Sequence, residues 1–342
     1  MKKITLVLCL CLAAFGDFID FNYKEAFFDF NFSLAKTDMN TVSLNAENDV
    51  FYRGNPTDRY YTNGVRLDFS SYQKNIDETT YYKKVGLFIA MNMYTPEIID
   101  VPDIQYDDRP FAGWSRVGLE KIVAKQSGWA YRNEYSIGIL GPYAIQENVQ
   151  VFWHKHVTPV AKTPRGWDNQ ISNELAVQYR GIMSYEILQE NQNYSLKPYS
   201  NLELGNVFIR GGLGLELAFG GLANYSETGP VMAKEFNTLN NLHSFKDNFY
   251  SSLAVYGRVE GNFVAHNGTI QGGLYDKWFD QDSPYTTGIH PFVFDTEIGV
   301  IAGFSKSFEM IYSLNTRSSE SSIHAWQWNR HNWGRVRFLL KF

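Results

Sequence analysis

The chain has 342 residues, a formal net charge of -5 and 16% aromatic residues, with 27 Gly and only 11 Pro. Its mean hydropathy of -0.31 excludes a membrane protein built from apolar helices. The mildly acidic balance argues against nucleic acid as a partner. A β-barrel remains compatible with these values, because its strands alternate apolar and polar side chains and its aromatic girdles enrich Tyr, Phe and Trp.

The first sixteen residues are typical of a secretory signal peptide. Two lysines precede an apolar run over residues 4–14, and small residues follow it. The run is too short to cross a bilayer as a helix. A bulky leucine before each cysteine argues against a lipoprotein signal. Cys9 and Cys11 are the only cysteines, so we expect the mature chain, residues 17–342, to contain neither a disulfide nor a thiol nucleophile.

Polar residues interrupt two alternating runs at residues 41–51 and 60–70. In the second run Tyr61 shares its parity with the apolar positions 65, 67 and 69, so we expect Tyr61 to face lipid and Thr62 to point away from it. In the first run, strict alternation places Asp49 inward and Asn48 outward. Either the strand ends near Glu47 or a bulge reorients Asn48.

A second polar group lies between residues 141 and 174. Gln150 and His154 are four residues apart, so they share one face whether the segment is helical or extended. A single histidine in an exported barrel is more often a structural loop residue than a catalyst. Its proximity to a cation site would favour catalysis.

Strand-like runs rich in Val, Ile, Tyr and Phe recur along the whole chain, bounded by Gly, Asn, Asp or Pro. The last of them, "GRVRFLLKF", alternates up to a terminal Phe342, which is typical of the closing strand of a bacterial outer-membrane barrel; a soluble sandwich is the alternative. We find no internal repeat and no composition shift. The sequence therefore predicts an all-β fold, a single transmembrane antiparallel β-barrel of about 12 strands over residues 17–342.

Six short motifs occur in an order that resembles one known family. They are "ENDVF" from Glu47, "DRYYTNG" from Asp58, "YTP" from Tyr94, "DRPFAGW" from Asp108, "GP" with "VQVFWH" ending at His154, and "GWDNQ" from Gly166. Together they resemble the outer-membrane lipid A 3'-O-deacylases, strongly over residues 40–180 and by barrel character elsewhere.

The resemblance implies an activity and a set of site residues. Members of that family are barrels of about twelve strands that remove the 3'-linked acyloxyacyl chain of lipid A by calcium-dependent ester hydrolysis, at a site between the wall and the outer leaflet. The family's essential Asn-Asp pair falls on Asn48 and Asp49, its hydroxyl on Thr62, its glutamine on Gln150 and its histidine on His154. We expect lipopolysaccharide as substrate, other outer-membrane lipids as surroundings, and a monomer.

The chemistry of these residue types agrees with that activity. Calcium prefers oxygen ligands, which Asp49, Asn48 and Thr62 provide, and it would stabilise the negative oxygen of the attacked ester. A neutral His154 would take a proton from the attacking water, with Gln150 orienting the histidine or the water. The chain contains no G-x-S-x-G serine elbow. Asp49 could instead be a structural carboxylate paired with Arg59 or Arg66.

The sequence departs from the family pattern in two places. Some members have a lysine shortly after "YTP", but residues 97–108 contain none, so the cation or Arg109 would have to stabilise the oxyanion. Counting back from Trp167 selects His156 instead of His154 as the histidine. We expect Asp108 and Arg109 to form an inward ion pair.

Other roles stay open at this stage. Asp168 or Glu174 could approach the cation. Two competing functions are a passive outer-membrane channel or structural barrel and an outer-membrane phospholipase, and a deacylase fold that has lost its activity is a third possibility.

Overall fold

The computed structural model describes residues 37–52, 58–74, 78, 80–125, 127–157, 162–190, 194–220, 253–274, 282–305, 307–328 and 330–342. The expected signal peptide, residues 1–16, lies outside this part of the chain. In the described part no helix is both long enough and apolar enough to cross a membrane.

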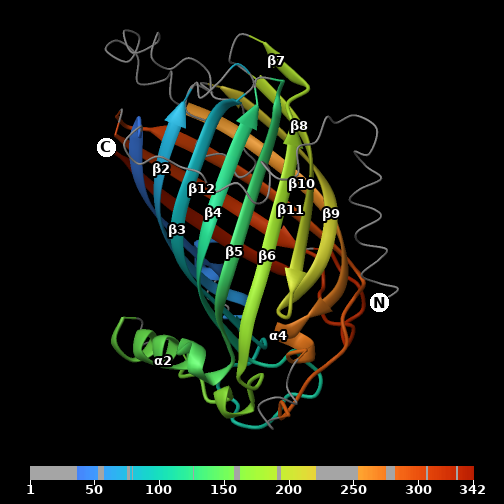
Figure 1. The fold of residues 1–342 in the computed structure, drawn as a ribbon. Helices are drawn as coiled ribbons and strands as arrows, with labels where there is room; N and C mark the ends of the chain where they lie inside the picture. Colours follow the sequence, from blue (N-terminus) through green and yellow to red (C-terminus); the bar gives the residue numbers. More distant parts are fainter. Residues whose placement is uncertain are drawn as a thin grey trace.

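A closed barrel of twelve antiparallel strands forms the wall, as the sequence predicts (Figure 1). The wall strands are β1 (Met39–Asn48), β2 (Tyr60–Lys74), β3 (Thr80–Thr95), β4 (Ala112–Lys125), β5 (Trp129–Leu140), β6 (Glu174–Tyr185), β8 (Tyr194–Gly205), β9 (Phe208–Gly220), β10 (Leu253–Asn267), β11 (Phe292–Gly303), β12 (Phe308–Arg317) and β13 (His331–Lys341). The short β7 (Leu188–Glu190) pairs only with β8 and extends one hairpin beyond the wall.

Two pairings close the barrel. The first and last strands, β1 and β13, pair in register with Leu44 opposite Phe338, and β6 pairs with β8. On β13 Phe338 and Leu340 are exposed on the outer surface, whereas Arg335 and Arg337 line the interior. The alternation of the C-terminal strand is therefore confirmed.

The prediction for the start of β2 is wrong. From Gly64 onward the alternation holds, with Arg66 inside and Phe69 exposed outside. A β-bulge between Tyr61 and Asn63 reverses the parity before that point. Tyr61 consequently lies inside and donates a hydrogen bond to Glu47, while Thr62 is turned to the outer side of the wall.

Charged side chains fill much of the lumen. Arg66 pairs with Asp68 at 2.7 Å and with Glu134 at 2.9 Å, and Arg335 pairs with Glu297 at 2.8 Å across several strands. They leave a cavity of about 260 Å³. Ion pairing compensates these buried charges, so the polar interior is compatible with a packed barrel.

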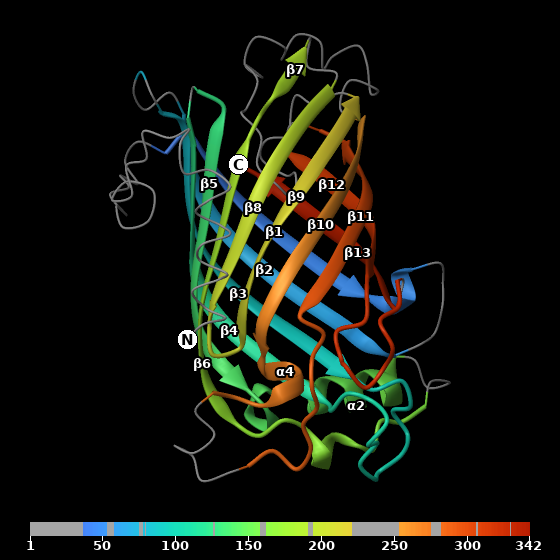
Figure 2. The ribbon, with the colours of Figure 1, turned by 90° about the vertical axis from the view of Figure 1, so that its right-hand side faces the viewer.

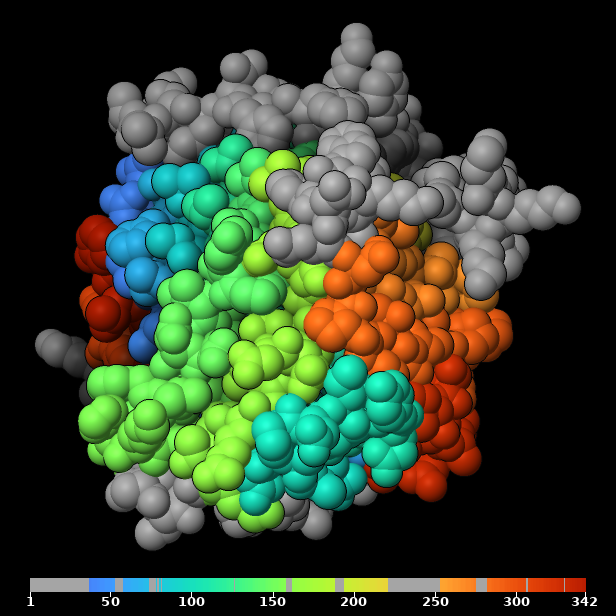
Figure 3. Space-filling view, turned by 90° about the horizontal axis from the view of Figure 1, so that it is seen from below, coloured from blue at the N-terminus to red at the C-terminus, as the bar shows by residue number. Residues whose placement is uncertain are grey.

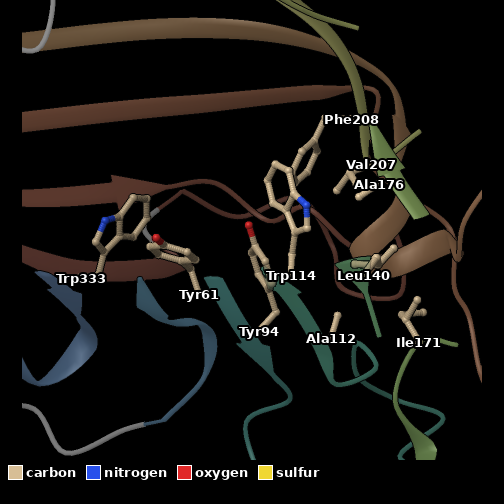
Figure 4. Close-up of a cluster of buried hydrophobic side chains, with 10 residues drawn as sticks. All are labelled: Tyr61, Tyr94, Ala112, Trp114, Leu140, Ile171, Ala176, Val207, Phe208 and Trp333. Carbon is tan, nitrogen blue, oxygen red and sulfur yellow. The ribbon is translucent and has the colours of Figure 1, made fainter. Parts of the chain in front are cut away.

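An aromatic layer crosses the lumen near one end (Figure 4). Tyr61, Tyr94, Trp114 and Trp333 belong to one buried cluster together with Phe208 from β9. Tyr61 lies 5.1 Å from Trp333 and 5.4 Å from Tyr94, measured between ring centroids. These rings join β2, β3, β4 and β13 just below the strand ends that carry the candidate site.

The described loops lie together at this end, which we call the mouth (Figures 2 and 3). Hydrogen bonds and ion pairs join them. Arg109, which follows β3, donates to the Thr269 hydroxyl at 2.8 Å in the short helix α4 (Gly268–Gln271) and pairs with Glu320 at 3.5 Å. His324 contacts Asp108 at 3.2 Å. Three segments distant in sequence are thus held together there.

Candidate active site

The candidate site lies on the outer side of the wall at the mouth, beneath a helix. This helix, α2 (Gln146–His156), packs outside β3 and β4 (Figure 1). It follows a single 3-10 turn, η4 (Pro142–Ala144), which contacts β4 and β5. Gly113 allows the close approach, because a Cβ there would lie 2.6 Å from the Gln146 Oε1.

The face of α2 turned to the wall is polar. Its buried residues are Gln146, Gln150 and His154, one helical turn apart. Gln146 donates to the Ser115 hydroxyl at 2.9 Å, and the Gln150 Oε1 accepts from the Trp167 Nε1 at 2.8 Å. The expected shared face of Gln150 and His154 is therefore confirmed, and the segment that provides it is helical.

The second half of the site comes from the end of β1. Asn48 ends the strand, and its Oδ1 caps the short 3-10 helix η3 (Asp49–Phe51) by accepting from the Val50 N–H at 2.8 Å. This agrees with a strand that ends near Glu47. The next residue, Asp49, is 2% exposed and its Oδ2 accepts from the Arg59 backbone N–H at 3.1 Å.

Asp58 joins these two halves. Its Oδ2 lies 3.0 Å from the His154 Nε2, and its carbonyl accepts from the Thr95 hydroxyl at 3.2 Å. The Thr95 hydroxyl in turn contacts the Thr62 hydroxyl at 2.7 Å. Asp49, Thr62 and His154 are therefore all within one or two contacts of Asp58, a residue to which the sequence analysis gave no role.

The electrostatics of the two carboxyl groups are unusual. Burial, reinforced by the nearby charge of Asp58, raises the pKa of Asp49 to about 8. Burial also raises the pKa of Asp58, and the positive charge of His154 opposes that rise. The structural alternative for Asp49 is not realised, because Arg59 pairs with Glu97 at 2.9 Å and Arg66 pairs with acidic side chains of the lumen. Neither arginine therefore stabilises the charged form of Asp49 through an ion pair.

These residues fit a calcium ion in one specific respect. The Asp49 Oδ1 is buried and has no hydrogen-bond partner, and an oxygen in that state is stabilised by a hard cation. Asp58, the Thr62 hydroxyl and the Asn48 amide provide further oxygens nearby. Among the described residues no group of three or more His, Cys, Asp and Glu side chains could hold a metal. A cation here would thus depend on two carboxylates and neutral oxygens.

Several other expectations are resolved by position. Arg109 is buried in the mouth with its guanidinium over the Tyr94 ring at 4.7 Å, and it meets Asp108 through its backbone N–H, so the expected Asp108–Arg109 side-chain pair is wrong. The Glu174 carboxylate accepts from Asn206, and Asp168 is exposed on a separate 3-10 turn, η5 (Trp167–Asn169).

The structure also separates the two histidines. His154 is buried at Asp58, and its Nδ1 faces the Lys162 carbonyl at 2.6 Å. His156 is exposed and packs against Phe152 in a tilted arrangement, with 4.8 Å between ring centroids. Counting forward from Gln150 therefore selects the histidine that lies at the site.

The motif order, the twelve-stranded wall and this site agree with one family. A family model described as "Outer membrane protein LpxR" matches residues 7–342, nearly the whole chain. The chain belongs to the LpxR family. LpxR proteins are the outer-membrane lipid A 3'-O-deacylases, and the chain is accordingly an outer-membrane protein.

The solved structure of an LpxR protein has the same fold as this chain, and other outer-membrane barrels are less similar. LpxR from Salmonella typhimurium is 23% identical with a TM-score of 0.67, and the match covers 88% of this chain and 99% of that one. The β domain of the Bordetella autotransporter BrkA is 8% identical with a TM-score of 0.45 (88% and 98% covered), and the translocator domain of NalP from Neisseria meningitidis is 9% identical with a TM-score of 0.41 (100% and 96% covered). A search of curated protein sequences gave no match.

Proposed function

We propose that this protein hydrolyses the 3'-linked acyloxyacyl ester of lipid A in the outer leaflet, with a calcium ion and with water activated by His154. Membership of the LpxR family supports the substrate and the reaction. One observation carries the mechanism. On the outer side of the wall His154 contacts Asp58, and Asp49, which has a buried oxygen without a hydrogen-bond partner, accepts a hydrogen bond from the backbone N–H next to Asp58. A lipid ester can reach that surface without entering the barrel.

Connection lengths support the placement at the outer leaflet. Outer-membrane barrels have short periplasmic turns and longer extracellular loops. The connections at the mouth include the long spans 96–111, 141–173, 268–291 and 318–330, and those at the opposite end include the short spans 75–79, 126–128 and 304–307. The span 206–207 at the mouth and the span 221–252 at the opposite end depart from this pattern. We therefore assign the mouth, and with it the site, to the cell surface.

The contacts of His154 support a role as general base. A carbonyl can only accept a hydrogen bond, so the Lys162 carbonyl holds the proton of a neutral imidazole on Nδ1. The Nε2 is then the atom that takes a proton from the attacking water, once that water displaces the Asp58 Oδ2 from its 3.0 Å contact with the ring. As the ring becomes positively charged, the Asp58 carboxylate at Nε2 stabilises it. Gln150, fixed by Trp167, keeps its amide group on the same face and orients the water.

Asp49, Asn48 and Thr62 would hold the calcium ion, with Asp58 as a further oxygen donor. When bound, the ion would supply a positive charge for the oxyanion that develops on the ester carbonyl. This charge would have to come from a cation, because the Arg109 side chain pairs with Glu320 in the mouth.

The test compares lipid A from cells that express the wild-type protein, His154→Ala or His156→Ala, by mass spectrometry with and without a calcium chelator. We expect loss of the 3'-linked acyl chains with the wild-type protein and with His156→Ala, and none with His154→Ala or after chelation. The same spectra report the glycerophospholipids. Cleavage of those lipids with intact lipid A would contradict the proposal in favour of a phospholipase.

A further inference from the structure

The helix over the site has its polarity inverted. A helix on the surface of a water-soluble protein buries its apolar face, but α2 buries Gln146, Gln150 and His154. Its outer face carries Phe152 and Trp153, which are 60% and 53% exposed. Large apolar side chains that face outward, with the polar side chains buried against the wall, indicate a surface suited to an apolar environment.

This apolar surface continues from the wall onto the helix. Ile139 is exposed at the end of β5, Tyr143 is exposed in η4, and Ile145 is exposed where α2 begins. From there the exposed positions Val149, Phe152 and Trp153 follow along the helix. Since the outer surface of an outer-membrane barrel contacts lipid, the same lipid would also contact α2.

The charge of the helix end fits the same surroundings. Lys155 is exposed in the last turn of α2, and Lys162, which follows the helix, is largely exposed while pairing with Asp100 at 3.1 Å. Aromatic side chains beside lysines are the pattern of a helix that lies in a membrane interface, with its rings among acyl chains and its cations near phosphate groups.

We propose that α2 lies in the outer leaflet, with Phe152 and Trp153 inserted among lipid acyl chains. The occupant of this surface is therefore the acyl region of the leaflet, including the chains of the substrate. The helix thus separates lipid on one side from the polar site at His154 on the other, so that an ester at the base of an acyl chain arrives at the depth of that site. This deepens the proposed function and rests on it for the placement of the mouth.

The test measures depth and needs no activity. Nitroxide labels are attached to Phe152→Cys and Trp153→Cys in the mature protein, residues 17–342, which contains no other cysteine. The labelled protein is placed in vesicles of phosphatidylethanolamine and phosphatidylglycerol. Phe69→Cys on the outer face of β2 is the lipid reference and the exposed Asp103→Cys is the water reference. We expect the ratio of oxygen to nickel-chelate accessibility at both helix positions to be several-fold above that at residue 103 and close to that at residue 69.

Accessibility at residues 152 and 153 equal to that at residue 103 would overturn the proposal. Spin–spin broadening between copies would also overturn it, because it would assign the surface to a second copy of the chain.

A conservative variant repeats the test without a label. Brominated acyl chains should quench the fluorescence of the wild-type protein more than that of Trp153→Phe. Failure of either measurement would leave the deacylation assay, and with it the proposed function, untouched.

Discussion

At the residue scale, the contacts of His154 support its proposed role as a base. Its two ring nitrogens face two different acceptors, the Lys162 carbonyl at 2.6 Å and the Asp58 carboxylate at 3.0 Å. The first fixes the tautomer, and the second can stabilise the protonated ring. Asp58 is therefore expected to act on the reaction through His154, in addition to any contact with the cation.

Replacing Asp58 with Asn tests this role. The amide keeps the size of the side chain but removes the charge that stabilises the imidazolium, so we expect deacylation to slow by about 10- to 100-fold at saturating calcium. The rate is measured on detergent-dispersed lipid A. Asp168→Asn, which changes an exposed carboxylate on η5, is the matched control and should retain the wild-type rate. An unchanged rate in Asp58→Asn would show that His154 works without this carboxylate.

Asp49 gives a prediction of how the stability of the protein changes with pH. Its raised pKa, about 8, means that the folded protein disfavours the charged carboxylate in the absence of a cation. The protein therefore loses stability as the pH rises from the ordinary range of an aspartate to about 8. In a chelator, Asp49→Asn should unfold at the same temperature as the wild type at low pH and at a higher temperature at pH above 8.

Circular dichroism of the β-structure during heating provides the measurement. Calcium should stabilise the wild type but not Asp49→Asn, because ligand binding to the folded state raises its stability. A variant that gains as much from calcium as the wild type would place the cation away from Asp49.

The sequence predicted most of these residues but misplaced one. The four-residue spacing of Gln150 and His154 places both on one face in a helix or in a strand, and the motif order pointed to Asn48 and Asp49, whose roles stay predictions. Thr62 was assigned to the wrong side because alternation cannot reveal a bulge. The bulge follows Tyr60, whose φ of 63° is rare for a residue other than glycine, and tertiary contacts hold it there.

At the element scale, the position of α2 against the wall sets the geometry of the candidate site. The helix approaches β4 at Gly113, and Gln146 occupies the space that a side chain would need. The glycine is part of the "FAGW" motif in the sequence, but only the packing of α2 against β4 explains why a glycine is needed there. Asp58 gave no signal for a related reason: its role comes from a contact between loops that are far apart in sequence.

Gly113→Val tests the coupling between helix position and catalysis. The new side chain would meet the Gln146 side chain and move α2 outward, so His154, the proposed base, would be displaced from Asp58. Displacements of about 1 Å can lower a rate by about 100-fold. Gly257→Ala is the control, because the nearest atom to its added Cβ is 4.0 Å away. A folded Gly113→Val barrel with normal deacylation would contradict this role of the glycine.

At the scale of the whole molecule, the strand count and the closing strands followed from alternation and length, since these reflect the bilayer directly. The arrangement of the interior did not follow from the sequence. The sequence shows only that the lumen residues are polar. Their pairing across strands, such as Arg335 of β13 with Glu297 of β11, requires the closed barrel. The same pairs make the lumen a packed interior, with the aromatic layer and the bonded loops of the mouth above it.

The arrangement predicts that the protein is not a conductive pore. Ions would have to pass the Arg66 and Arg335 networks, the ring of Tyr61, Tyr94 and Trp333, and the contacts of Arg109 in the mouth. Rearranging paired buried charges is costly, because each ion left without its partner is destabilised by about 3–5 kcal/mol. In a planar bilayer we expect no stepwise conductance from the purified protein, whereas a porin in the same membrane conducts. Steady conductance together with an unchanged lipid A would favour the channel over the enzyme.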